Sequence, residues 1–133
     1  MKEEFIPQYA HTWRVFARLV NDFDDHAWLH TGRKAITPAR LSVHLLQAAK
    51  YYLEDRTEIA FPSGKPLDLD WEKVGEDELP SRADVLAGIA DLSGRTEHWL
   101  NGIDYAAPNT SFDWAGKTRL GVVIFLLRHF LFH

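Results

Sequence analysis

The sequence predicts an all-α domain, an up-and-down four-helix bundle. Four stretches repeat their apolar residues at steps of three and four, and no stretch shows the alternating pattern of a strand. Segments rich in proline, glycine or acidic residues separate these stretches. The chain has 133 residues, which suits one domain spanning residues 1–133.

The first two predicted helices have recognisable starts. Pro7 suits the first turn of the first helix, and Gly32 indicates that this helix stops somewhere before residue 32. Its end is placed only to within a few residues, because Asp24, Asp25 and His26 interrupt the apolar pattern. The second helix starts with Thr37 as cap and Pro38 in the first position, and runs to about Arg56. The apolar face of the first helix is made of Tyr9, Trp13, Phe16, Val20, Phe23 and Ala27.

The last two helices fill the C-terminal half of the chain. Ser81 is the predicted cap of the third helix, with Asp84 as its capping-box partner, and Asn101-Gly102 is the exit. The fourth helix begins at about residues 114–117 and is apolar nearly all round from Leu120 onward. This helix is therefore central to the core, or it also faces a partner subunit.

An acidic stretch, residues 67–79, lies between the second and third helices. Its Asp-x-Asp spacing is reminiscent of a calcium loop, but Lys73 stands where such a loop needs glycine and Leu79 where it needs glutamate. We therefore expect a solvated loop.

Composition excludes several classes of function. The formal net charge is −4, which disfavours nucleic acid or an anionic membrane as a partner. The chain has no cysteine, so it offers neither a disulfide nor a thiolate metal site, and it fits a cytoplasmic location. No signal peptide is recognised, and the longest nonpolar run, Leu120–Leu127, is much shorter than the ~20 residues of a membrane helix.

Histidines on apolar helices are the candidate functional residues. His129 and His133 are four residues apart, so their rings leave the same helix face about one turn, ~6 Å, apart. His44 interrupts the apolar stripe of the second helix between Leu41 and Leu45. Three imidazoles can hold a divalent metal and leave positions open for water or substrate. The alternative is that each is a hydrogen-bonded core histidine.

The other histidines fit ordinary positions. His26 and His30 share the four-residue spacing, but they lie in a polar stretch near a helix end, which predicts a surface pair. Glu97 or His98 could add a fourth ligand, although only one of the two can point inward. A surface position is the alternative for at least one of them.

Two segments resemble the DinB/YfiT-like family of helical metalloproteins. These are Thr-Pro-Ala-Arg-Leu-Ser-Val-His-Leu-Leu-Gln (37–47) and Leu-Leu-Arg-His-Phe-Leu-Phe-His (126–133). The resemblance implies a four-helix bundle, often dimeric, with a metal held by His44, His129 and His133. Members usually continue beyond the second histidine of the pair, so the resemblance leads us to expect either a longer native chain or another group that pins His133.

The expected function is that of a metal-dependent enzyme in the cytoplasm. The resemblance implies a thiol-dependent transferase using a low-molecular-weight thiol, or hydrolase-like chemistry. Imidazole ligands suit zinc, nickel, iron or copper. Arg128 is the candidate for binding a substrate carboxylate, with a surface ion pair as the alternative. Tyr51, Tyr52 and Trp99 are the candidates for the pocket wall, with core packing as the alternative.

The second hypothesis is a binding or structural module without catalysis. In that case the apolar fourth helix serves a homodimer, and the metal is structural or absent. Phe125 and Phe132 are the residues we expect at such an interface.

Overall fold

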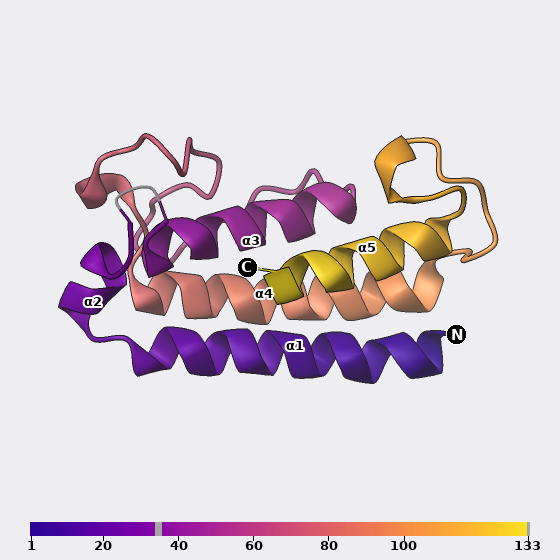
Figure 1. Ribbon diagram of the computed structural model, residues 1–133, viewed down its shortest axis with the longest axis horizontal. Coiled ribbons are helices and arrows are strands. Elements are labelled where there is room, and N and C mark those ends of the chain that lie inside the picture. The colour runs from indigo at the N-terminus through magenta and orange to yellow at the C-terminus, as the bar shows by residue number, and fades with distance from the viewer. Residues whose placement is uncertain (34–35, 133) are drawn as a thin grey trace.

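The computed structural model describes residues 1–33 and 36–132, and it confirms the all-α class (Figure 1). No strand occurs in these residues, which contain only two isolated bridges. The helices are α1 (Lys2–Asp22), α2 (Asp25–His30), α3 (Pro38–Tyr52), α4 (Arg82–Gly102) and α5 (Arg119–Phe132), with short 3-10 turns η1 (Glu76–Glu78) and η2 (Asp113–Ala115).

The predicted starts of α3 and α4 are confirmed by their caps. The Thr37 hydroxyl accepts a hydrogen bond from the backbone N–H of Arg40 at 3.4 Å. Ser81 and Asp84 form the predicted capping box, because the backbone N–H of each residue donates to the side chain of the other. These side chains satisfy backbone donors that have no partner within the first helical turn.

The first predicted helix is divided in two. α1 ends at Asp22, and the Asp24 carboxylate accepts a hydrogen bond from the Ala27 N–H at 2.7 Å, which starts the short α2. A side chain that caps a new helix competes with continuation of the old one. α5 starts slightly later than predicted, because η2 and Gly116, with φ of +124°, precede it.

The four longer helices pack side by side around one core (Figure 1). α1 and α5 run in the same direction: Tyr9 lies beside Val123 and, further along both helices, Trp13 lies beside Phe130. The Tyr9 hydroxyl donates to the Val123 carbonyl at 2.5 Å, inside the core. Burial raises the pKa of Tyr9, so the hydroxyl stays protonated as a donor.

α3 and α4 also run in one direction, so the predicted up-and-down alternation is wrong at this connection. Leu46 lies beside Gly88, and further along Asp55 forms an ion pair with Arg95 at 3.1 Å. The intervening residues 53–81 return along the bundle before α4 begins (Figure 1). Helical bundles contain parallel neighbours where such a long crossover is present.

Part of that crossover packs on α3 and is not the fully solvated loop that the acidic sequence predicted. Gln47 donates from its amide to the carbonyls of Leu67 and Leu69 at 2.9 and 2.7 Å. Arg40 donates to the carbonyl of Trp71 at 3.0 Å. Residues 67–71, which we call the crossover segment, are thus fixed along one side of α3.

α5 is embedded on one side and open on the other. Val123 and Leu126 are fully buried, whereas Ile124 and Leu131 are 48% and 76% exposed. In the described residues no helix is both long enough and apolar enough to cross a membrane.

Candidate metal site

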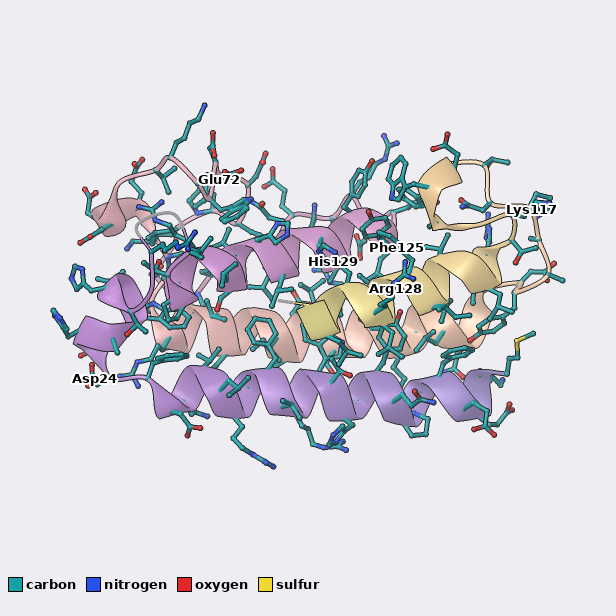
Figure 2. The ribbon with its side chains drawn as sticks, in the orientation of Figure 1. Asp24, Glu72, Lys117, Phe125, Arg128 and His129 are labelled. Atoms are coloured by element: carbon teal, nitrogen blue, oxygen red, sulfur yellow. The ribbon has the colours of Figure 1, made fainter. Side chains whose placement is uncertain are left out.

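α3 and α5 bring two of the predicted ligands together. The ring centroids of His44 and His129 lie 5.3 Å apart, with the ring planes at 66°. Both side chains are half-buried. Figure 2 shows His129 and Phe125 on the side of α5 that faces α3, with Arg128 beside them. α3 and α5 run in opposite directions (Figure 1), and one histidine from each helix contributes to the pair.

The separation of the two rings fits a shared metal ion. A metal–nitrogen bond is about 2.1 Å long, so an imidazole centroid lies about 3.2 Å from the ion. Two such rings at a tetrahedral angle have centroids about 5.2 Å apart. The distance between His44 and His129 agrees with this value. The two imidazoles come from facing helices, which is the usual way in which a helical bundle builds a metal site.

The third predicted ligand, His133, lies outside the described residues. Within residues 1–33 and 36–132, no group of three or more histidine, cysteine, aspartate or glutamate residues has metal-binding geometry. Glu97 and His98 are exposed on α4, and His98 lines a different cleft. α4 therefore supplies no fourth ligand to the pair.

Aromatic rings enclose both histidines. The indole of Trp71 packs against His44, with centroids 4.7 Å apart and planes at 32°. The Phe125 ring stacks on His129 at 6.1 Å and 19°, and the Tyr52 ring lies 6.5 Å from His129. These contacts restrict the orientations of both imidazoles.

The two histidines line the wall of an open cleft of about 1310 Å³. The cleft extends between the C-terminal half of α3 and the loop that follows it. Aromatic residues Tyr51, Tyr52 and Phe112 form part of the lining, in mutual ring contacts of 4.9 to 5.2 Å. Charged side chains also line it; they are Lys50, Glu54, Asp55, Arg56, Glu58, Lys65 and Asp68. A small polar molecule with an apolar part suits such a surface.

The predicted substrate-binding residues lie in different places. Tyr51 lines the cleft and is 57% exposed. Arg128 is exposed and holds its guanidinium 5.6 Å from the centroid of the Phe125 ring, next to His129 in the chain. Trp99 is not in the lining of this cleft: its ring packs edge-on against Tyr9, and it faces the smaller cleft that His98 lines.

His26 and His30 lie on the surface, as predicted. Both are exposed on α2, with ring centroids 4.6 Å apart. The Nδ1 atom of His30 lies 3.5 Å from a carboxylate oxygen of Glu76. This pair has the same sequence spacing as His129 and His133, but apart from the two imidazoles themselves no aromatic ring of the described residues contacts it, so it is a useful control.

Tyr52 lines the cleft, as the sequence predicted, whereas Trp71 and Phe125 were not predicted as neighbours of the histidines. A signal for Trp71 was present, since Leu67, Leu69 and Trp71 alternate with exposed Asp68 and Asp70. Alternation of this kind is typical of an extended segment with one buried face. The pattern was not recognised because the acidic residues favoured the interpretation of residues 67–79 as a solvated loop.

Comparison of the chain with protein-family models, with curated proteins and with solved structures finds no match. The resemblance to the DinB/YfiT-like family therefore rests on the two sequence segments alone.

Proposed function

We propose that the protein is a metal-dependent enzyme whose divalent ion is held by His44, His129 and His133. The observation that carries the proposal is the 5.3 Å separation of His44 and His129 in the wall of a large cleft. Zinc, nickel and iron are the ions that such a set of imidazoles suits best.

The proposed chemistry is thiol-dependent transfer, or a related hydrolysis. A divalent ion held by these histidines would supply Lewis acidity, by which water or a thiol becomes a nucleophile near neutral pH. The chain itself positions the ligands, because Trp71 packs against the ring of His44 and Phe125 against that of His129. Tyr51 offers an aromatic surface to the apolar part of a substrate.

We also propose that the domain is a four-helix bundle of the DinB/YfiT-like family. Four long helices in the expected order support this assignment, as does the position of His44 opposite the last helix. The family implies a low-molecular-weight thiol as one substrate. One fold can host many functions, so the proposed function rests on the pair His44 and His129 and not on the fold.

Metal content measured by inductively coupled plasma mass spectrometry tests this function. Tag-free protein should contain close to one equivalent of a divalent ion, and His44→Ala and His129→Ala should lose it. The matched control His26→Ala should keep it, because that ring lies on the surface. Full metal occupancy in His44→Ala contradicts the proposal. A low-molecular-weight thiol that is consumed only in the presence of the metal-loaded protein then indicates thiol-dependent chemistry.

A second candidate function, a non-catalytic homodimer module, is favoured by the outer face of α5. Ile124 and Leu131 are seven residues apart, so they share one helix face, and both are exposed. Phe125, which we expected at such an interface, instead packs against Tyr52 and His129. The side chain of Phe132 lies outside the described part of the structure.

Analytical ultracentrifugation separates assembly from chemistry. If α5 forms a dimer, Ile124→Asp with Leu131→Asp should give a monomer whose metal content is unchanged. A wild-type protein that is monomeric at all concentrations contradicts the dimer. A dimer without bound metal that cannot be reconstituted favours the module over the enzyme.

A further inference from the structure

Arg40 is a buried cation with few partners. Only 8% of this residue is exposed, and its guanidinium donates one hydrogen bond, to the carbonyl of Trp71 at 3.0 Å. Among the described residues, no carboxylate lies within ion-pair distance of it. A guanidinium has five N–H donors, and burying it without a counter-ion is costly.

The remaining donors of Arg40 open onto a cavity. None of its nitrogens is both fully buried and without a hydrogen-bond partner, so the donors that bond no protein atom reach open space. The cavity has a volume of about 390 Å³, and it lies on the side of α3 where the crossover segment ends. Its other lining residues include His30, Lys73 and Glu76.

The place of Arg40 near the start of α3 makes the cavity more electropositive. Arg40 is in the first turn, which contains no acidic residue. The helix dipole is positive at this end, so it repels the guanidinium and attracts an anion. Lys73 is exposed and makes no hydrogen bond or ion pair with any described side chain. Among the described residues of the lining, Glu76 is the only acidic one, and its carboxylate lies beside His30.

We propose that this cavity binds a small oxyanion group, a carboxylate or a phosphate, between Arg40 and Lys73. The planar guanidinium matches the paired oxygens of such a group, and Lys73 contributes a second positive charge from the rim. The site is separate from the cleft that His44 and His129 line, and it does not depend on the proposed metal.

The proposal predicts opposite changes in anion affinity when the cation or the anion at the rim of the cavity is removed. Removing the rim cation by Lys73→Gln should weaken anion binding by about threefold, the size expected of an exposed charge. Removing the negative charge by Glu76→Gln should strengthen binding by a similar factor of about three. A purely structural role for Arg40, holding the Trp71 carbonyl, predicts neither effect.

The experiment is isothermal titration calorimetry of the full chain with inorganic phosphate and, separately, with acetate. Chloride keeps the ionic strength constant, because screening alters exposed charges. We expect saturable binding of at least one anion, loss of about tenfold in Arg40→Lys, which lacks the planar fork, and no change in the control Arg18→Gln on α1. The anion that binds identifies the class of ligand. If His44→Ala, which should lose the proposed metal, still binds the anion, then the anion does not bind to that metal.

Absence of saturable binding of both anions to the wild-type protein overturns the proposal. Binding that is equal in wild type, Lys73→Gln and Glu76→Gln overturns it as well. These two variants change exposed side chains, so they decide the question even if Arg40→Lys does not fold.

Discussion

The indole of Trp71 lies against the imidazole of His44, with ring centroids 4.7 Å apart, although the two residues belong to different segments. Arg40 and Gln47, one on either side of His44 along α3, hold the crossover segment by hydrogen bonds to its carbonyls. α3 thus fixes the segment that in turn restricts the ring of His44. This contact ties the irregular part of the fold to the candidate metal site.

Replacing Trp71 should therefore affect both stability and metal binding. Trp71→Ala removes a half-buried ring, and we expect a loss of about 2 kcal/mol in the free energy of unfolding, below the 3–5 kcal/mol of a fully buried aromatic. Metal affinity should fall about tenfold, as for other residues that orient ligands. Urea unfolding measures the first effect, and competition with a chelator measures the second.

Trp71→Phe is the control for the ring contact, because it keeps an aromatic face beside His44. It should retain most of the metal affinity. If Trp71→Ala binds metal as tightly as wild type, the indole does not orient His44.

Asp84 should make the stability of the fold depend on pH. Burial opposes ionisation of its carboxyl group, but hydrogen bonds from Ser63 and Ser81 outweigh this effect and lower the pKa of Asp84. A lowered pKa means that the stabilisation is complete above the pKa of an unfolded aspartate, about 3.9. The stabilisation is lost as the pH falls from there through the lower pKa of the folded state.

Asp84→Asn should reduce the free energy of unfolding by about 1–3 kcal/mol at pH 7, because the hydrogen bonds to a charged group are lost. Its stability should also change less than that of wild type below pH 4. A residual slope is expected from Asp55, whose pKa a backbone hydrogen bond from Thr57 lowers. Urea unfolding at a series of pH values checks this, and parallel curves for the two proteins would rule out the assignment.

Two glycines should respond in opposite ways to alanine. A Cβ at Gly121 would lie 2.5 Å from the carbonyl oxygen of Ala115 and 3.1 Å from the Cα of Gly116, and backbone atoms cannot easily move away. We expect Gly121→Ala to destabilise the protein by about 1–3 kcal/mol through overpacking. The readout is the midpoint of thermal unfolding.

Gly94 is the matched comparison. It lies exposed in the interior of α4, and a Cβ there would meet no atom within 4 Å. Gly94→Ala should raise stability by about 0.5–1 kcal/mol, because alanine favours the helix and restricts the unfolded chain. A stabilising Gly121→Ala would show that the approach of α5 to residues 115–116 is looser than the structure indicates.

The sequence predicted the helices well where local chemistry decides them. Thr37, Ser81 and Asp84 cap their helices through neighbours three residues away, so the pattern contains the whole interaction. Asp24, Asp25 and His26 interrupt the apolar pattern, so the end of the first helix was predicted only to within a few residues, and the short helix that Asp24 caps was not predicted. Asp24 can either cap a new helix or remain inside a continuing one, and a periodic pattern of apolar residues does not show which of the two is more stable.

The direction of α4 could not be read from the sequence. It depends on where residues 53–81 run, and that course is fixed by long-range hydrogen bonds from Arg40 and Gln47. The proximity of His44 to α5 was predicted from single positions on two helices, whereas Trp71 and Phe125 around the pair were not. Ring contacts between segments that are distant in the chain produce no local pattern in a single sequence.

The most direct test of the proposed metal site is a crystal structure of the metal-loaded protein, with anomalous diffraction at the absorption edge of the ion. The account predicts one strong anomalous peak between His44 and His129, within about 2.1 Å of a nitrogen of each ring. A peak at His26 and His30 instead, or none beside His44 in protein that contains a stoichiometric ion, would contradict it.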